Sequence, residues 1–376
     1  MKKFFFFAAI AAVGLASCSS DETIASQATS ESNEISFRPF TTGLTRAVDI
    51  TTANLTSFVV NAMVAGGETP YFSNATYTGT SGGTFTCTDK HYWPSGGSLD
   101  FYAYAPASND QVTAYTNYKT FTVQPSATAA EQVDLVYAAT KGKNKAANAA
   151  GVELNFRHTE SKVLIKLYNS NASSIDVEVR DASICNVKNS GVFTFADTNT
   201  DGNNTGSGTT LTTSTWDVSA ASSTYYIQTD ASSTKYNVVL GNAVQVGEDW
   251  ILIPQTFTYA TEYSAAAAGS EFTAPCIKVN LKIKNHATSA YIVGAASGTN
   301  DGYITALWPL KADPTAWVPG KRYTYTVDLA GGGYFETNQD TNADLDPILE
   351  GAEIKFVNVT VDDWTNVGGG VYDTGL

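Results

Sequence analysis

Short runs in which apolar and polar residues alternate are the feature that most constrains this 376-residue chain. The clearest run spans residues 276–284 and alternates isoleucine, valine and leucine with lysine and asparagine; similar runs occupy residues 162–167 and 323–329. Alternation places the two kinds of side chain on opposite faces of a β-strand. No long stretch has the apolar spacing of a helix, and Gly, Asn, Asp or Pro separates the runs. The chain is therefore predicted to be all-β, with antiparallel sheets packed face to face.

The charge balance argues against several classes of partner. The chain carries 36 acidic and 22 basic residues, and its formal charge of -14 opposes binding to nucleic-acid phosphates. Three histidines and four cysteines leave little material for a zinc site, which usually needs several nitrogen or sulfur ligands close together. We therefore expect no nucleic-acid partner and no metal or organic cofactor.

The N-terminus has the pattern of an export signal. Lys2 and Lys3 precede an apolar run, residues 4–13, that is too short to span a bilayer. Small residues then lead to Cys18, as in a bacterial lipobox, where the cysteine is acylated. We expect residues 1–17 to be a lipoprotein signal peptide and Cys18 to carry a lipid that anchors the chain in the outer membrane. A plain secretory signal with an incidental cysteine is the alternative.

The residues after Cys18 are predicted to be a flexible tether, residues 18–34. They are small and polar and offer too little apolar surface to offset the entropy of ordering. The acidic residues 19–22 resemble the surface-export tag of lipoproteins in some Gram-negative anaerobes. Ordered structure is expected to begin near Ile35.

The length favours two domains. Two similar motifs support this division, because WPSG at residues 93–96 and WVPG at residues 317–320 each precede an alternating run. Between them, residues 141–150 are small and polar, a composition typical of a domain boundary. We predict an N-terminal β-sandwich of residues 35–148 and a C-terminal β-sandwich of residues 149–376.

The motifs and their order resemble the fimbrillins, lipoprotein-derived pilus proteins of Gram-negative anaerobes that assemble by donor-strand exchange. Besides the lipobox, the matching motifs are ISFRPFTTGLTRA at 35–47, DLVY at 134–137, LNFRHTESKV at 154–163, ILIPQT at 251–256, WVPGKRYTY at 317–325 and VTVDDW at 359–364. The resemblance implies two tandem transthyretin-like antiparallel β-sandwich domains with no catalytic residues, so the chain is expected not to be an enzyme. It also implies a surface-exposed location in a fimbria, with other pilus subunits as partners.

The resemblance further implies which residues take part in assembly. In such pilins an N-terminal strand fills a groove until an arginine-specific protease cuts behind it, and a strand from another subunit then replaces it. The candidate removable strand here carries the apolar residues Ile35, Phe37 and Phe40. The candidate cut lies between Arg46 and Ala47. The alternative is that Arg46 is an ordinary loop residue and the strand stays in place.

The candidate donor strand lies near the C-terminus, where Val357, Val359 and Val361 form an apolar stripe. The glycine-rich residues 368–370 that follow are poor strand material. If residues 354–364 are instead the last strand of the second domain, little remains to donate. A tip or accessory role is then favoured over a stalk role.

A glycan-binding lipoprotein of the outer membrane, outside any pilus, is the alternative function. Aromatic side chains can stack on sugars, and Trp216 and Trp250 lie near predicted turns, so these two are the candidates for a glycan contact. Core packing is the simpler interpretation of the other aromatic residues. A host or bacterial surface receptor is a further candidate partner.

Two loops have part of the spacing of a calcium site. Asp197, Asn199 and Asp201 place oxygen ligands at alternate positions before a glycine, and a second series contains Asp340, Asn342, Asp344 and Asp346. Neither has the bidentate acid that completes such a loop. Solvated turns are therefore the favoured interpretation.

The cysteines and one esterase-like motif complete the candidates. After lipidation at most one internal disulfide can form, and the spacing of Cys87, Cys185 and Cys276 does not require one. Residues 79–83 fit the pattern G-x-S-x-G, but the strand and helix that must flank a nucleophile of that kind are not evident. A hydrolase is therefore not favoured.

Overall fold

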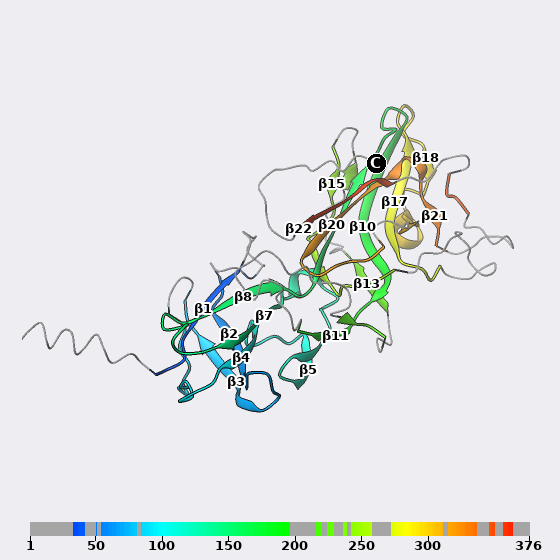
Figure 1. The fold of residues 1–376 in the computed structure, drawn as a ribbon. Coiled ribbons are helices and arrows are strands. Elements are labelled where there is room, and N and C mark those ends of the chain that lie inside the picture. Colours follow the sequence, from blue (N-terminus) through cyan, green and yellow to red (C-terminus); the bar gives the residue numbers. More distant parts are fainter. Residues whose placement is uncertain are drawn as a thin grey trace, which may run out of the picture.

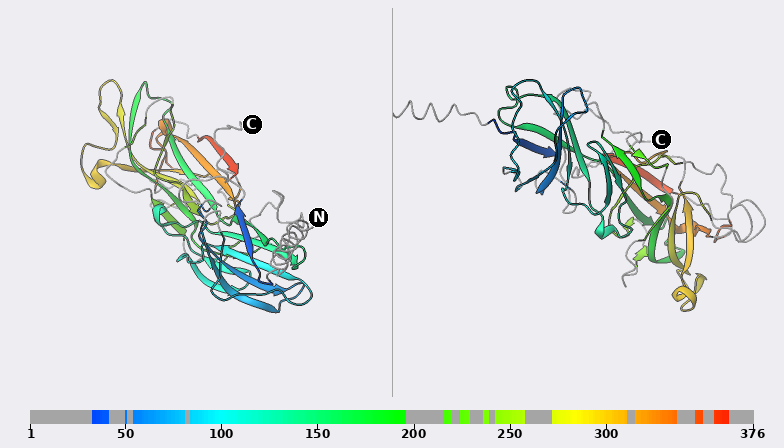
Figure 2. Two further views of the ribbon diagram at one scale, coloured as in Figure 1. Left: turned by 90° about the vertical axis from the view of Figure 1, so that its left-hand side faces the viewer. Right: turned by 90° about the horizontal axis from the view of Figure 1, so that it is seen from below.

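The computed structural model describes residues 33–41, 50, 54–80, 84–195, 216–219, 224–228, 236–238, 242–257, 272–310, 315–336, 346–349 and 356–363. These residues form β-strands in four sheets together with short 3-10 turns, so the predicted all-β class is confirmed. Figure 1 shows two lobes joined end to end, and both views in Figure 2 show the same elongated arrangement. Among the described residues, no helix has the length and apolar character needed to cross a bilayer.

The first lobe contains a six-stranded and a four-stranded sheet. The six-stranded sheet has the order β1-β8-β7-β4-β2-β3, formed by Phe37–Thr41, Val152–His158, Val136–Lys143, Leu99–Ala105, Ser57–Val64 and Pro70–Thr78. The four-stranded sheet has the order β12-β11-β6-β5, formed by Trp216–Asp217, Gly191–Thr194, Thr120–Val123 and Val112–Asn117. A short turn η1, Ala129–Glu131, follows β6.

The second lobe contains a seven-stranded and a five-stranded sheet. The first has the order β13-β10-β17-β19-β21, formed by Thr224–Gln228, Ile175–Lys188, Cys276–Asn285, Ile304–Pro309 and Tyr334–Phe335, with β14 (Tyr236–Val238) on β10 and β18 (Tyr291–Val293) on β17. The second has the order β15-β9-β20-β22, formed by Val244–Gln245, Ser161–Tyr168, Lys321–Asp328 and Phe356–Asp363, with β16 (Trp250–Leu252) on β9. The turns η3 (Thr299–Gly302) and η4 (Leu329–Gly331) follow β18 and β20.

The core of the second lobe lies between its two sheets. The apolar face of β17 is fully buried there, as its alternation predicted: Ile277, Val279, Leu281, Ile283. The opposite face of β17 is also covered, because Asn280 and Lys282 are only 6% and 4% exposed. The segment between β18 and β19 covers them. The alternation therefore predicted the buried apolar face of β17 correctly, but it did not predict that the polar face of this strand is also covered.

Both faces of the six-stranded sheet are covered as well. One face packs against the four-stranded sheet through an aromatic cluster that contains Tyr102, Tyr137, Phe121, Phe193 and Trp216. The other face lines an interior that contains Phe37, Phe58, Phe101, Phe156 and Trp93. The first of these side chains belongs to β1, so the N-terminal strand contributes to the core of the lobe.

The boundary predicted between residues 148 and 149 does not separate the strands of the two lobes. β8 follows that point and pairs with β7 in the six-stranded sheet, and β11 and β12 complete the four-stranded sheet. Residues 144–151 connect the antiparallel neighbours β7 and β8, so the segment 141–150 covers the end of β7 and most of this connection. A small, polar segment is as typical of a hairpin connection as of a linker between domains. Composition therefore could not show that this segment joins two strands of one sheet.

The chain first crosses between the lobes at Thr159 and Glu160, where backbone groups are fixed on both sides. The amide and the hydroxyl of Thr159 each donate to the carbonyl of Leu135 at 2.9 Å. The amide of Gly320 in the second lobe donates to the carbonyl of Glu160 at 2.8 Å. The amide of Ile251 donates to Oε1 of Gln132 across the junction at 2.5 Å. These bonds tie the two lobes together at the crossing.

Candidate assembly site

The strand β1 lies at one edge of the six-stranded sheet and pairs with β8. The pairing is parallel, with Phe37 opposite Val152 and Thr41 opposite Phe156. The other pairs of described strands in this sheet are antiparallel. Because β1 comes first in the chain and β8 comes more than a hundred residues later, β1 is added along the edge of a sheet that the intervening chain forms (Figure 1).

A second segment holds the residues just before β1. The amide of Ile35 donates to the carbonyl of His91 at 2.8 Å, and the amide of Trp93 donates to the carbonyl of Asn33 at 2.9 Å. Glu34 and Tyr92 form the antiparallel bridge between these bonds. The N-terminal segment is therefore bonded first to residues 91–93 and then to β8.

The apolar side chains of this segment point into the first lobe. Ile35 is 1% exposed and Phe37 is 5% exposed. The ring of Phe37 meets three other rings edge-on, with centroid distances of 4.9 Å to Tyr77, 5.3 Å to Phe101 and 6.1 Å to Phe58. Tyr77 lies on β3, at the opposite edge of the six-stranded sheet from β1. The sheet is thus curved so strongly that a residue of one edge strand fills the interior beside the other edge strand.

Polar side chains of the segment remain near the surface. Arg38 pairs with Glu153 of β8 at 2.8 Å, and Glu34 pairs with Lys90 at 2.8 Å. These four side chains are between 34% and 59% exposed, and exposed ion pairs contribute little to stability. The stability of the docked strand must therefore come mainly from its backbone bonds and from the burial of Ile35 and Phe37.

A glycine makes room for the strand. Gly151, just before β8, has a φ of +103°, and a Cβ placed on it would lie 3.1 Å from Ser36 Oγ and 3.2 Å from Arg38 Cγ. The amide of Val152 next to it donates to the carbonyl of Ser36 at 2.8 Å. A side chain at this position would meet β1 and strain the backbone, so glycine permits both the close approach and the turn.

Two titratable rings near the strand are held in their neutral forms. Burial, with a smaller effect of Cys87, raises the pKa of the Tyr77 hydroxyl above its usual range. His91 stacks on Phe72 with ring centroids 3.9 Å apart, and partial burial lowers the pKa of His91 below 6.5. The surroundings of β1 are thus apolar and uncharged on the inner side, which suits an extended strand with apolar side chains.

The arrangement has a clear physical capacity. Without residues 33–41, the hydrogen-bonding edge of β8 and the rings around Phe37 would face water together. An unpaired edge beside an apolar surface readily accepts another extended strand, because main-chain bonds and burial are restored at once. A surface of this kind suits a strand that carries apolar side chains two residues apart.

The candidate donor strand is β22, the edge strand of the five-stranded sheet. It pairs antiparallel with β20, with Val359 opposite Tyr325 and Val361 opposite Tyr323. Val359 packs against the core of the second lobe, whereas Val361 is 48% exposed. Val357 lies in the same strand. β22 is thus paired within its own chain as a strand of the second lobe.

Several predicted residues lie outside the described part of the chain. These are the lipid-attachment residue, the two residues of the cut and most calcium candidates: Cys18, Arg46, Ala47, Asp197, Asn199, Asp201, Asp340, Asn342 and Asp344. Phe40 lies in β1 opposite Asn155. Among the residues that the structure does describe, no three His, Cys, Asp or Glu side chains gather as metal ligands would.

The prediction of a glycan contact by two tryptophans is wrong. Trp250 is fully buried in the core of the second lobe, and Trp216 is 6% exposed in the aromatic cluster of the first lobe. Nε1 of Trp216 donates to the carbonyl of Thr159 at 2.6 Å. Neither ring has a free face for a sugar. Both belong to short strands, where burial in the sandwich core outweighs the proximity to turns on which the prediction depended.

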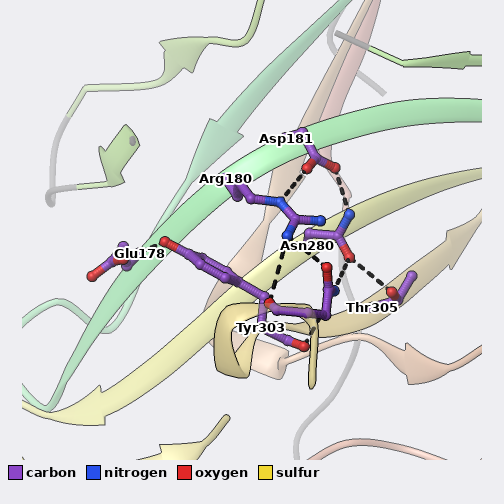
Figure 3. Close-up of polar contacts among 7 residues, drawn as sticks. Glu178, Arg180, Asp181, Asn280, Tyr303 and Thr305 are labelled. Atoms are coloured by element: carbon purple, nitrogen blue, oxygen red, sulfur yellow. Dashed lines mark hydrogen bonds and ion pairs between the residues drawn. The ribbon is translucent and has the colours of Figure 1, made fainter. Parts of the chain in front are cut away.

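A polar network covers part of the outer face of the seven-stranded sheet. Its residues come from β10, β17 and the segment 300–305, and Figure 3 labels six of them: Glu178, Arg180, Asp181, Asn280, Tyr303 and Thr305. Asn300 belongs to the same network, because its Oδ1 accepts from Nη1 of Arg180 at 2.5 Å. Asp181 accepts from Asn280 Nδ2 at 2.5 Å and from Arg180 Nε at 2.7 Å. The hydroxyl of Tyr303 donates to Glu178, and its ring lies under Lys282, 4.3 Å from Nζ. Because the polar groups bond to one another, this network fastens the covering segment to the sheet.

Two carboxyl groups are buried at the junction of the lobes. Asp134 Oδ1 lies 2.9 Å from His158 Nδ1, and Asp134 Oδ2 accepts from the amide of Ile50 at 2.7 Å. Glu160 Oε2 accepts from the amide of Leu135 at 3.0 Å, while its Oε1 has no hydrogen-bond partner among the described residues. Burial, and secondly the charge of Asp134, raises the pKa of Glu160 well above its usual range. Burial therefore favours the neutral form of the Glu160 carboxyl.

The comparisons with known proteins identify the family of the chain. The profile of the Fimbrillin-like family matches residues 45–364. The chain belongs to this family. Membership indicates a structural, pilus-associated role at the cell surface. No curated protein matches the chain.

Solved structures resemble this fimbrillin-like chain at low sequence identity. A fimbrial protein from Bacteroides vulgatus has a TM-score of 0.53 at 15% identity, over 88% of this chain and 99% of that one. The tip fimbrial protein of Porphyromonas gingivalis, with a C-terminal truncation, has a TM-score of 0.36 at 8% identity, over 85% and 97%. The fimbrial anchor protein of the same organism has a TM-score of 0.31 at 9% identity, over 88% and 98%. The first of these likenesses supports the fold.

Sequence reasoning missed several residues that build the site. Residues 91–93, which bond to the N-terminal segment, carry no strand pattern of their own. Gly151 directly follows the segment 141–150, whose composition predicts a domain boundary. The only available signal was the position of Gly151 directly before an alternating run, because a glycine there often marks a close approach of another backbone.

Proposed function

We propose that this protein is a fimbrial subunit that accepts a strand from a neighbouring subunit after its own β1 has been removed. The observation that carries the proposal is the position of β1 as a parallel edge strand whose Phe37 fills the interior of the first lobe. A covalently attached strand that can be cut behind its end keeps the groove closed until assembly.

The proposal includes export as a lipoprotein. Acylation of Cys18 would hold the precursor at the outer membrane, because acyl chains bind the bilayer through their buried methylene groups. Cleavage between Arg46 and Ala47 would separate the lipid and β1 from the rest of the chain in one step. The same cut would therefore release the subunit from the membrane and open its groove.

We propose a tip or accessory position rather than a stalk position. Val357, Val359 and Val361 have the alternation of a donor strand, but β22 is already paired with β20 and completes an edge of the five-stranded sheet. A stalk subunit must both accept and donate a strand. Using β22 as a donor would expose the surface of the second lobe that it covers, so this chain is better suited to accepting a strand.

The test uses the strand itself as a probe. The full-length precursor is treated with an arginine-specific protease, and the new N-terminus is sequenced. A fluorescent peptide with the sequence of residues 33–41, NEISFRPFT, is then added to the cut and the uncut protein. We expect the cut protein to begin at Ala47, to lose residues 1–46 and to bind the peptide, while the uncut protein does not bind it.

Matched variants separate the parts of this proposal. Arg46→Ala should block cleavage and peptide binding, whereas Arg38→Ala, within the paired strand, should leave cleavage behind Arg46 unchanged. Failure of the cut protein, freed of residues 1–46, to bind the peptide would disprove the accepting groove. SDS-resistant ladders formed by the cut protein alone would show that it also donates a strand, which would disprove the tip or accessory position.

A further inference from the structure

Two of the three described cysteines lie directly opposite each other in the second lobe. Cys185 near the end of β10 and Cys276 at the start of β17 are register partners in an antiparallel pair. Both are reduced in the structure, and they are 1% and 0% exposed. The two residues come from segments separated by about ninety positions in the chain, so only the pairing of these two central strands brings the thiols together.

The surroundings hold the two sulfur atoms against each other. Phe272 and Leu307 pack around them in a small apolar cluster. Nδ2 of Asn186 donates to the carbonyls of Phe272 and Ala274 at 2.9 Å each, and it lies 3.9 Å from Sγ of Cys276. These bonds keep the segment before β17 in place over the thiols.

The electrostatics agree with a hydrogen-bonded pair of neutral thiols. The hydrogen bond to Cys185 is the main cause that raises the pKa of Cys276 well above its usual range, and burial adds to it. Lys278 is close enough to act in the opposite direction, but it is ion-paired with Glu336. A thiol that stays protonated is a poor nucleophile, which argues against a catalytic cysteine here.

The backbone geometry suits a covalent bond. Residues directly opposite in antiparallel strands have Cα atoms about 4.5 to 5.5 Å apart. Disulfides span Cα distances of about 4.4 to 6.8 Å. The two strands would therefore not have to move apart or together for the sulfur atoms to join.

We propose that Cys185 and Cys276 are a disulfide-forming site that joins β10 to β17 in the exported protein. The oxidant is a disulfide donor of the thiol–disulfide exchange type. One cysteine attacks the donor disulfide and displaces one thiol, and the second cysteine then attacks the mixed disulfide and displaces the other thiol. One Sγ–Sγ bond forms, the donor disulfide is reduced to two thiols, and the two protons of the cysteines pass to them.

The bond is expected to form during folding rather than afterwards. In the folded lobe the thiols are covered by Phe272 and Leu307, so a bulky donor cannot reach them. Cys87 lies in the first lobe beside Tyr77, in the interior that β1 closes, and cannot meet either of them in the folded chain. Of the three possible pairings among Cys87, Cys185 and Cys276, the fold therefore allows only that of Cys185 with Cys276. The spacing of the cysteines in the sequence could not distinguish these pairings.

The experiment maps the thiols after oxidative refolding. The full-length protein is reduced in urea, refolded with glutathione disulfide and glutathione, alkylated, and digested with trypsin without reductant. The peptide of residues 181–188 should appear linked to the peptide of residues 236–278, lighter by two hydrogen atoms than the sum of the two reduced peptides. Separate alkylated peptides, or a link from either peptide to Cys87, would overturn the proposal.

A stability measurement gives a second readout. The oxidised protein should unfold about 5 to 10 °C higher than the same protein kept reduced, because the bond restrains the unfolded chain. Cys87→Ala should retain this difference, and Cys185→Ala should lose it. An equal difference in Cys185→Ala would show that oxidation acts elsewhere and would also overturn the proposal. Neither readout depends on the proposed strand exchange, so the two proposals fail independently.

Discussion

The substitution Phe37→Ala tests the idea that the N-terminal strand is a structural part of the first lobe until it is removed. Phe37 is 5% exposed and meets three rings, so its loss removes most of an aromatic side chain from the core. Phenylalanine-to-alanine changes in cores cost about 3 to 5 kcal/mol. We expect about 3 to 4 kcal/mol here, because the site lies at an edge strand that can partly relax.

The assay compares the precursor with the protein cut behind Arg46. In urea unfolding, the Phe37→Ala precursor should show the whole expected decrease in the free energy of unfolding. After cleavage and release of the strand, the variant and wild-type proteins are identical and should unfold alike. A peptide of residues 33–41 carrying the same change should bind the emptied groove more than about 100-fold more weakly than the unchanged peptide.

Arg38→Ala is the matched control, because this neighbour lies on the same strand but its side chain is 54% exposed. It should change the free energy of unfolding by less than about 1 kcal/mol. If Phe37→Ala is as mild as Arg38→Ala in the precursor, the strand contributes no core, and the accepting groove inferred from it does not exist.

Two further predictions concern Glu160 and Gly151. The folded-state pKa of Glu160 is raised above its ordinary value of 4.5, so the contribution of Glu160 to stability is fully present below about pH 4.5 and is lost as the pH rises through the folded pKa. In urea unfolding at pH 4 and 7, Glu160→Gln should therefore lose less stability between the two pH values than the wild type does. An equal loss in both proteins would contradict the buried neutral carboxyl. Gly151→Ala should destabilise the precursor by about 1 to 3 kcal/mol, because the φ of +103° suits glycine and the added Cβ meets Ser36. Peptide binding to the cut protein should weaken as well, and full affinity would show that the groove tolerates a side chain there.

The strands of the second lobe could be predicted because their signal is local. Residues 276–284 and 323–329 alternate without interruption, and both form strands, β17 and β20. In each run, the alternation alone identifies which side chains form the buried face of the strand. The cover on the opposite face of β17 comes from a segment that lies some twenty residues away in the chain, so no local pattern reports it.

The errors have a common physical cause. The prediction of a domain boundary at residues 141–150 depends on composition. The prediction of a glycan contact by Trp216 and Trp250 depends on their closeness to turns. Composition does not tell a hairpin connection from a linker, and a tryptophan beside a turn can still point into a sandwich. Both questions are decided by which strands become neighbours, which depends on pairings between distant segments.

Under the proposed strand exchange, the contacts of β1 also specify the strand that would replace it. The exposed ion pairs of Arg38 and Glu34 add little, and any extended chain can supply the backbone bonds. What distinguishes one strand from another is therefore the pair of apolar side chains at the positions of Ile35 and Phe37. An aromatic ring at the second position would meet the rings of Tyr77, Phe101 and Phe58, whereas a valine would leave space unfilled. A strand with the valine stripe of β22 should therefore fill this groove less completely than β1 does, so a neighbouring subunit that donates to this protein should carry a larger side chain there.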